Sequence, residues 1–149
     1  MKQKKSAITN RQALRDYHID KAYEAGLQLR GDEVKSLRNG KANLKGSFAK
    51  FEGNELYLFN MHISPYEYSR EESDPLRRRK LLLRRSELRQ LIAKVQQKGY
   101  TLVALKVYFK HGYAKVEIGL ARGKMLYDKR SALKEKQVKK EIDRALKQK

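Results

Sequence analysis

The amino-acid sequence predicts a mainly β protein: a small antiparallel β-barrel with flanking short α-helices and a basic C-terminal tail. Apolar and polar residues alternate in several short segments, which is the two-residue period of half-buried strands. Glycine-containing turns join these segments, and helical spacing with start and stop signals occurs in two short stretches of the body. The 149 residues, of which 40% are hydrophobic, are enough for one compact domain with a modest core.

The first 15 residues carry five basic side chains and no acidic one. This composition favours an arm that a polyanion orders over an element of the core. We therefore expect the barrel to begin near Tyr17. The chain then divides into a basic arm (1–15), a barrel (16–122) and a basic tail (123–149).

The first predicted strand covers residues 23–30, where four apolar residues fall at every second position. Gly31 ends this pattern. The next segment, 32–40, predicts a short helix because Asp32 and Glu33 at its start suit the helix dipole and a glycine at its end is a stop signal.

A β-hairpin is predicted next, with strands at 47–51 and 55–61 around a turn that contains Gly53. The chain has two prolines, which bound an exposed loop at 65–76. The very basic run 77–80 follows this loop directly.

Residues 86–98 predict a second helix, with Ser86 as its N-cap and Gly99 as its end. The clearest hairpin follows. Val103, Leu105, Val107 and Phe109 alternate before a His111-Gly112 turn, and Ala114, Val116, Ile118 and Leu120 alternate after it, so that each strand keeps one polar face. Short antiparallel strands with these additions are typical of an OB-type barrel of about five strands, a common platform for nucleic acid.

Residues 122–149 hold eleven basic and four acidic side chains. Val138, Ile142, Ala145 and Leu146 form a thin apolar stripe at helical spacing, which is too small to support a core of its own. We expect this tail to be largely disordered when free and helical on a surface that binds it.

The formal net charge of +19 is the strongest functional signal, because such self-repulsion is hard to tolerate without an anionic partner. The absence of cysteine excludes disulfides, thiol catalysis and cysteine-ligated zinc. No apolar run approaches the ~18–20 residues that span a bilayer. The expected protein is cytoplasmic, and its expected partner is a nucleic acid and not a membrane.

RNA is favoured over duplex DNA because no major-groove recognition helix or zinc finger is evident and tyrosines lie among the basic residues. Tyr17, Tyr23, Tyr66 and Tyr127 are candidates for stacking on unpaired bases. Tyr23 lies on the apolar face of its strand and is expected in the core, so Tyr17 is the better candidate. Glu24 faces away from that core, where its carboxylate can accept hydrogen bonds from base amino and imino groups.

Catalysis has little support in the sequence, and we expect no enzyme activity, no cofactor and no metal site. His18, His62 and His111 are scattered and lack a metal-binding spacing. Asp32 and Glu33 are adjacent on a predicted helix and therefore point in different directions. Two other readings remain open: a structural ribosomal protein, and a metal-dependent nuclease that uses these two carboxylates.

Seven segments in order carry a family resemblance: NRQALRDY (10–17), YEAG (23–26), EVKSLRNGKANLKGSF (33–48), NMHISPYE (60–67), RKLLLRRSEL (79–88), GYTLVALKVYFKHG (99–112) and GKMLYDKR (123–130). Together they resemble the SsrA-binding protein family, also called small protein B, over about residues 8–147. The resemblance implies an OB-type barrel that binds the tRNA-like domain of transfer-messenger RNA. It also implies delivery by elongation factor Tu to stalled 70S ribosomes for trans-translation.

The resemblance further implies two sets of site residues. Asn10, Tyr17 and Glu24 match the family positions that engage the D-loop region of the RNA. The tail is implied to become a helix in the vacant mRNA channel beyond the small-subunit decoding centre. Its residues with implied roles there are Gly123, Lys124, Tyr127, Asp128, Lys129, Arg130, Ala145 and Leu146.

Two positions depart from the family pattern. Met125 stands where a second lysine is usual, which weakens one phosphate contact. Phe48 stands where many members have tyrosine, which removes a hydroxyl but keeps a stacking face.

Overall fold

The computed structural model describes residues 7–69, 74–97 and 99–123. Its elements in chain order are β1 (Ile8–Thr9), α1 (Arg11–Asp16), β2 (Tyr17–Leu27), α2 (Gly31–Arg38), β3 (Ala42–Asn43), β4 (Phe48–Glu52), β5 (Glu55–Phe59), β6 (His62–Ile63), β7 (Arg79–Leu82), α3 (Arg85–Val95), β8 (Tyr100–Lys110) and β9 (Tyr113–Gly123). The predicted tail, apart from Gly123, lies outside the described residues.

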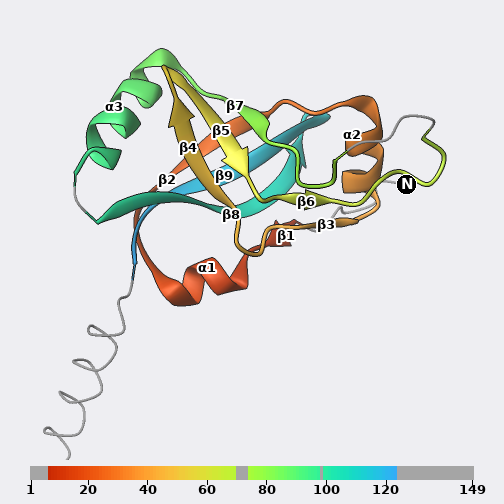
Figure 1. The fold of residues 1–149 in the computed structure, drawn as a ribbon, viewed down its shortest axis with the longest axis horizontal. Coiled ribbons are helices and arrows are strands. Elements are labelled where there is room, and N and C mark those ends of the chain that lie inside the picture. The colour runs from red at the N-terminus through yellow and green to blue at the C-terminus, as the bar shows by residue number, and fades with distance from the viewer. Residues whose placement is uncertain (1–6, 70–73, 98, 124–149) are drawn as a thin grey trace, which may run out of the picture.

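Six antiparallel strands form a closed ring, which confirms the predicted barrel. The strands follow the order β8-β4-β5-β7-β2-β9, and pairing between β8 and β9 closes the ring. Helices α2 and α3 lie at opposite ends of the barrel, and α1 lies outside it beside β8 (Figure 1). Because the sheet closes on itself, its long strands leave few exposed edges.

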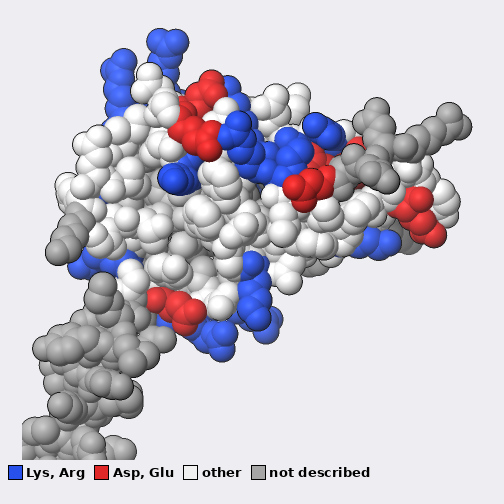
Figure 2. Space-filling view, in the orientation of Figure 1, with Lys and Arg blue, Asp and Glu red and all other residues white. Residues whose placement is uncertain are grey.

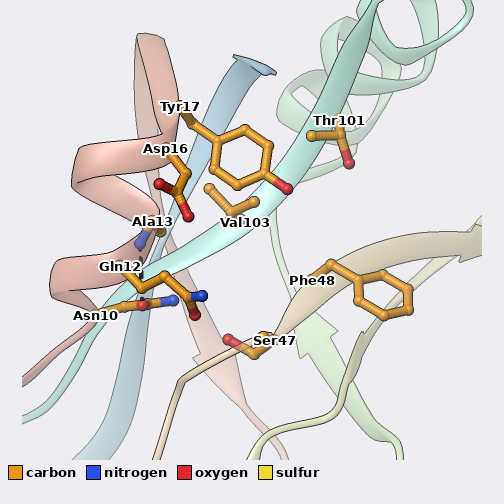
Figure 3. Close-up of a pocket in the computed structure, with 10 residues that line it drawn as sticks. Asn10, Gln12, Ala13, Asp16, Tyr17, Ser47, Phe48, Thr101 and Val103 are labelled. Atoms are coloured by element: carbon orange, nitrogen blue, oxygen red, sulfur yellow. Dashed lines mark hydrogen bonds between the residues drawn. The ribbon is translucent and has the colours of Figure 1, made fainter. Parts of the chain in front are cut away.

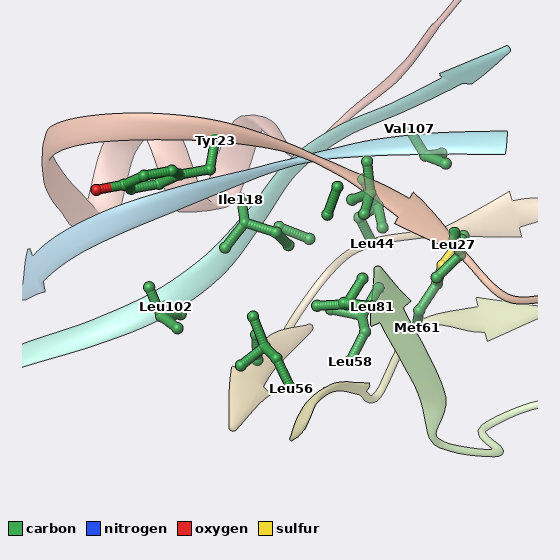
Figure 4. Close-up of a cluster of buried hydrophobic side chains, with 14 of the residues drawn as sticks. Tyr23, Leu27, Leu44, Leu56, Leu58, Met61, Leu81, Leu102, Val107 and Ile118 are labelled. Atoms are coloured by element: carbon green, nitrogen blue, oxygen red, sulfur yellow. The ribbon is translucent and has the colours of Figure 1, made fainter. Parts of the chain in front are cut away.

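The barrel interior is filled by aliphatic side chains from nearly every strand (Figure 4). Leu56, Leu58 and Ile118 have no exposed surface, and Tyr23 is 6% exposed, as its place on the apolar face of its strand predicted. The buried side chains alternate along each strand with outward-facing ones, so the two-residue period seen in the sequence corresponds to the inside and outside of the barrel.

The predicted helices and hairpins are present, whereas α1, the first half of β2, β7 and the two-residue strands β1, β3 and β6 were not predicted. Helices α2 and α3 coincide with most of the predicted helical segments 32–40 and 86–98, but each begins one residue earlier and ends two or three residues earlier. The β4-β5 hairpin turns at Gly53 as expected. In the β8-β9 turn, His111 has a φ of 51° and Gly112 a φ of 81°. Positive φ at both positions suits the twist of a tight hairpin.

One prediction about the β8-β9 hairpin is wrong. Val103, Leu105, Val107 and Phe109 were expected on one face, but the pairing of β8 with β9 shifts register between Ala104 and Lys106. The extra residue at this β-bulge reverses the side on which the following residues lie. Val107 consequently enters the barrel, whereas Val103 and Leu105 lie outside it.

A second hydrophobic cluster occupies the outside of the barrel beneath α1. It consists of Val103, Leu105, Ala121 and Ala13 of α1, with Tyr17 and Ile19 packed against it. A bulge in β2, between Ile19 and Lys21, places the start of this strand in the outer cluster and its second half in the barrel.

Part of the predicted N-terminal arm belongs to the folded body. Ile8 of β1 pairs with Val107 of β8, and Asn10 and Ala13 are both 4% exposed. The expected boundary near Tyr17 therefore does not match these contacts. The basic residues of this segment dominate its composition and mask the few apolar and capping residues that anchor it.

A buried carboxylate joins α2 to β7 and to the loop before it. Glu33, 4% exposed, accepts hydrogen bonds from the Arg30 backbone N–H (2.9 Å), from Arg77 and from Arg79 Nε (2.7 Å). The Arg79 guanidinium also donates to the carbonyls of Met61 (2.5 Å) and Pro75 (3.1 Å). Every nitrogen of this 1% exposed guanidinium therefore has a partner.

Both ends of this ion pair have displaced pKa values. Burial opposes the ionisation of Glu33, but the hydrogen bonds from Arg77 and Arg30 and the charge of Arg79 prevail and lower its pKa below the ordinary 4.5. Burial also disfavours the charged form of Arg79 and so lowers the pKa of its guanidinium, and the charge of Glu33 partly offsets this effect. The contribution of Glu33 to stability is thus complete above about pH 4.5 and is lost as the pH falls through its lowered pKa.

Replacing Glu33 by glutamine is expected to destabilise the fold by about 3–5 kcal/mol, because it leaves buried arginine charge without a counter-charge. Urea unfolding at pH 7 measures this loss. The matched control is Glu52→Gln, which removes the exposed Arg78–Glu52 pair and should cost less than about 1 kcal/mol. Equal losses for the two variants would contradict the assignment of Glu33 as a buried anchor.

Candidate RNA interface

Strands β2, β9 and β8 lie side by side, and the side of them that is turned away from the barrel interior is called here the outer face. It carries two of the predicted binding residues. Tyr17 pairs with Gly123 of β9, and Glu24 pairs with Glu117. Positions 117 and 123 are separated by an even number of residues, so they point to the same side of β9. Without the bulge in β2, Tyr17 and Glu24 would lie on opposite sides of the sheet.

The Tyr17 end of the outer face borders a hollow between α1 and the start of β4 (Figure 3). The hollow has a volume of about 240 Å³ and is lined by Tyr17, Gln12, Asp16, Phe48 and Thr101, among others. Phe48 stacks on Phe59, with ring centroids 5.5 Å apart. The rings of Tyr17 and Phe48, which come from separate elements, therefore border one small hollow. This arrangement is suited to stacking on bases.

Asn10 is buried beneath this end of the outer face and holds its elements together through hydrogen bonds. Its Oδ1 accepts from the Ala13 backbone N–H at 3.2 Å, which caps α1, as the dashed line in Figure 3 shows. Its Nδ2 donates to the carbonyls of Leu44 (3.0 Å) and Ala104 (2.9 Å). The amide of this buried side chain is thus fully engaged inside the protein, where it holds α1 against the barrel.

The Glu24 end of the outer face is open to solvent and polar. The Tyr108 hydroxyl donates to Glu24 Oε2, and Lys110 Nζ lies 3.5 Å from Glu24 Oε1. The hydrogen bond from Tyr108 is the main cause that lowers the pKa of Glu24; desolvation opposes it, and Lys110 and Lys115 lower the pKa further. The pKa of Tyr108 is raised by its own burial and by Glu24, so the phenol stays protonated and the carboxylate stays ionised near neutral pH.

Four residues of this open end were not singled out from the sequence: Lys106, Tyr108, Lys110 and Lys115. Lys106 pairs with Glu117 at 3.4 Å and lies over the Tyr108 ring at 5.5 Å. The signal that could have found them is the polar face of the β8-β9 hairpin, where every second residue points outward. The alternation with Val107 and Phe109 indicates this polar face, but only the bulge in β2 shows that Tyr17 and Glu24 lie on the same side of the sheet.

The two ends of the outer face are not one compact site. Tyr17 and Glu24 lie opposite positions 123 and 117, which are six residues apart on β9 and therefore roughly 20 Å apart at about 3.3 Å per residue. Tyr17 and Asn10 lie at the end that α1 covers, and Glu24 lies at the open end. A ligand that contacts both Tyr17 and Glu24 must therefore extend along β2, as a folded polymer can and a small molecule cannot.

Of the predicted tail residues, the structure describes only Gly123. Gly123 is the last described residue and lies beside Tyr17, whose Cε1 is 4.0 Å from where a Cβ on Gly123 would stand. The other predicted tail residues, Lys124, Tyr127, Asp128, Lys129, Arg130, Ala145 and Leu146, lie outside the described residues. The tail therefore begins at the Tyr17 end of the outer face.

The basic run 77–80 is paired with carboxylates of the protein itself. Arg77 and Arg79 bind Glu33, Arg78 binds Glu52, and Lys80 binds Glu55 at 2.9 Å. Figure 2 shows that blue and red side chains are intermixed in the upper part of that view. Much of the charge of this run is therefore matched within the protein.

Two further sequence expectations concern loops and carboxylates. Tyr66 packs edge-to-face on Tyr68, and its ring centroid lies 5.1 Å from Lys35 Nζ, so it contacts its own loop and α2.

The two adjacent carboxylates of α2 have separate partners. Asp32 accepts a hydrogen bond from Ser69. With Glu33 occupied by arginines, these adjacent carboxylates do not form the paired site that a metal-dependent nuclease would require.

Within the described ranges, no group of three or more His, Cys, Asp and Glu side chains is arranged to hold a metal ion. The described helices include none that is long and apolar enough to cross a membrane.

Comparison with known proteins gives a consistent result over nearly the whole chain. The family model described as SmpB protein matches residues 7–148. The SsrA-binding protein of Geobacillus thermodenitrificans is 56% identical over 140 residues, which cover 93% of this chain and 90% of that protein. The SsrA-binding protein of Syntrophotalea carbinolica is 55% identical over 143 residues, which cover 95% of each.

A solved structure supports the same relationship. Its description is "tmRNA-SmpB: a journey to the center of the bacterial ribosome", and the matched chain is 58% identical with a TM-score of 0.68. The match covers 80% of this chain and 85% of the other. The family model and the extent of sequence identity show the family of this chain. The protein belongs to the SmpB family of SsrA-binding proteins.

Proposed function

We propose that this protein is an RNA-binding adaptor that binds the tRNA-like domain of transfer-messenger RNA and brings it to stalled ribosomes for trans-translation. The observation that carries the proposal is the outer face of β2, which presents Tyr17 and Glu24 on one side of a strongly basic member of the SmpB family. Its proposed setting is the cytoplasm, with the 70S ribosome and elongation factor Tu as further partners. It acts by binding and without catalysis of its own.

The chemistry of the outer face supports recognition of folded RNA. Glu24 is ionised at neutral pH and accepts hydrogen bonds but is repelled by phosphate, so it favours base amino and imino groups over the backbone. Lys106, Lys110 and Lys115 surround it and supply attraction for phosphates. Tyr17 offers a ring at the other end of the same strand for stacking on an unpaired base.

Asn10 contributes to this binding as a positioning residue. Its side-chain amide is occupied by Ala13, Leu44 and Ala104, so its effect on RNA passes through the placement of α1 and Tyr17. This assignment gives the family position a physical role without requiring a direct contact between Asn10 and the RNA.

The tail acts after the RNA is bound. We propose that residues 123–149 become helical in the empty mRNA channel, with Tyr127 stacked on decoding-centre RNA and Ala145 and Leu146 on the apolar side of the helix. Lys124, Asp128, Lys129 and Arg130 contribute the polar contacts of that segment. Because the tail begins beside Tyr17, the RNA-binding body and the ribosome-binding segment meet at one end of β2.

Capture of native RNA tests the function as a whole. The intact protein, isolated from bacterial lysate with its bound RNA, is expected to show strong enrichment of transfer-messenger RNA when that RNA is sequenced. A random mixture of transcripts would contradict the proposal. Equal presence of the protein on all ribosomes, without preference for stalled ones, would instead favour a structural ribosomal protein.

Tyr17→Ala and Glu24→Ala should each weaken binding to the tRNA-like domain by roughly 1–3 kcal/mol, through loss of a stacked ring and of a base contact. Titration at fixed salt, followed by fluorescence anisotropy of labelled RNA, measures the change. Tyr68→Ala is the matched control because this ring is 75% exposed and lies on the loop after β6. The proposal fails if all three variants bind like the parent protein.

A chain that ends at Arg122 should bind the isolated RNA nearly as well as the intact protein but fail to support tagging of nascent chains on stalled ribosomes. The reason is that the outer face is complete without the tail, whereas ribosome entry requires it. Affinity and tagging are measured on the same preparation. A loss of RNA affinity on truncation would show that the two functions are not separable.

A further inference from the structure

An ion pair joins the bulge of β2 to the end of β9. Ile19 and Lys21 pair with consecutive residues of β9, so Asp20 is the additional residue of the bulge. Arg122 is the second-last residue of β9, and its Nη2 lies 3.3 Å from Asp20 Oδ1. The pair therefore connects the two strands beside the interruption of their regular pairing.

Tyr100 adds a third strand to this connection. It is the first residue of β8 and pairs with Arg122 across the sheet. Its hydroxyl donates a hydrogen bond to Asp20, which raises the pKa of the phenol. The guanidinium carbon of Arg122 also lies 5.9 Å from the centroid of the Tyr100 ring. One carboxylate thus holds groups from two other strands, and the three residues Asp20, Tyr100 and Arg122 are called here the clamp.

The clamp lies on the side of the sheet that is opposite to the outer face. Arg122 is one residue from Gly123, which lies beside Tyr17 on the outer face, so the Arg122 side chain points to the other side. Tyr100, its cross-strand partner, packs against the barrel core. The hollow beside Tyr17 has none of the clamp residues in its lining. Substitution of a clamp residue therefore removes none of the groups proposed to contact the RNA.

The register of β2 is held by apolar packing on both sides of the bulge. Ile19, before the bulge, packs in the cluster beneath α1, and Tyr23, after it, is 6% exposed in the barrel core. A slip of one residue would move both side chains to the wrong side of the sheet. We therefore expect the bulge to persist when the Asp20 carboxylate is removed.

The end of β9 is paired on one side only. Gly123 pairs with Tyr17 of β2, whereas the pairing of β9 with β8 ends one residue earlier, at Arg122 and Tyr100. Strand ends open more readily than strand centres, and the clamp provides a side-chain tether at this place. If the last three residues of β9 separated from the sheet, the start of the tail would move by up to roughly 10 Å, at about 3.3 Å per residue.

We propose that Asp20, Tyr100 and Arg122 act as positioning residues for the tail. The clamp keeps β9 paired up to Gly123, so that residues 124–149 start from one fixed place on the body. This inference rests on the proposed function and adds to it the residues that couple the RNA-binding body to the tail. A fixed start raises the effective concentration of the tail at its binding site, because the bound RNA holds the body at the same time.

Asp20→Ala in the full chain tests the clamp. Tagging of nascent chains by a preformed complex with transfer-messenger RNA should become about three- to tenfold slower, whereas affinity for the isolated RNA should stay within about twofold. Glu55→Ala is the matched control. Glu55 likewise accepts from a tyrosine, Tyr57, at 2.7 Å and pairs with a cation, Lys80, at 2.9 Å, but it lies on the opposite side of the ring from β9. This control should leave both the tagging rate and the affinity unchanged.

A double-mutant cycle separates the clamp from independent effects of its members. Arg122→Ala should slow tagging as much as Asp20→Ala does, and the double variant should be no slower than either single variant, because all three lose the same interaction. Amide hydrogen exchange of the free variants should be faster at residues 120–123 and unchanged at residues 114–117. Urea unfolding verifies that each variant is folded, and Asp20→Asn, which keeps the shape of the side chain, should slow tagging in the same direction.

Additive effects of the two substitutions, unchanged exchange at residues 120–123, or a loss of RNA affinity as large as the loss of tagging would overturn the clamp. If the parent protein supports tagging and Asp20→Ala behaves like Glu55→Ala, the clamp proposal fails and the proposed function stands. If the parent protein neither binds the RNA nor supports tagging, the proposed function fails and the clamp proposal fails with it.

Discussion

Closure of the sheet through β9 is the constraint on which the rest of the structure depends. This strand pairs with β2 along one edge and with β8 along the other, and each partner has a bulge while β9 runs without one. Each bulge changes which side chains of its strand face inward. The outer face is consequently divided into an apolar half beneath α1 and a polar half around Glu24, and β2 contributes a candidate binding residue to each.

The charge of the protein is less uniform than its total of +19 implies. The densest basic run of the body is bound to carboxylates, and one of its arginines holds α2, β6 and the loop before β7 together through Glu33. The outer face adds separate cations such as Lys106 and Lys110, whose ion pairs at 3.4 and 3.5 Å are open to solvent, and further basic residues lie in the tail sequence. Such an arrangement attracts an RNA backbone broadly and leaves specificity to a few hydrogen-bonding and stacking groups.

The position of Gly123 links the two parts of the proposed mechanism. The strand that forms the centre of the outer face ends beside Tyr17, so the tail leaves the body at one end of the RNA-binding surface. In the proposed mechanism, the RNA-binding strand and the start of the tail therefore share one end of the outer face.

The sequence by itself determined the second half of β2, the β4-β5 and β8-β9 hairpins with their turns, helices α2 and α3, and the polar exposure of Glu24, because each depends on local periodicity and turn chemistry. The family resemblance supplied Asn10 and the tail motif. Only the tertiary structure decided that Asn10 is buried, that the run 77–80 is paired internally, and that Tyr17 and Glu24 share a face with Lys106, Tyr108, Lys110 and Lys115. These features arise from contacts between residues distant in the chain and from two single-residue bulges, which reverse the inside and outside of a strand without a distinctive local pattern.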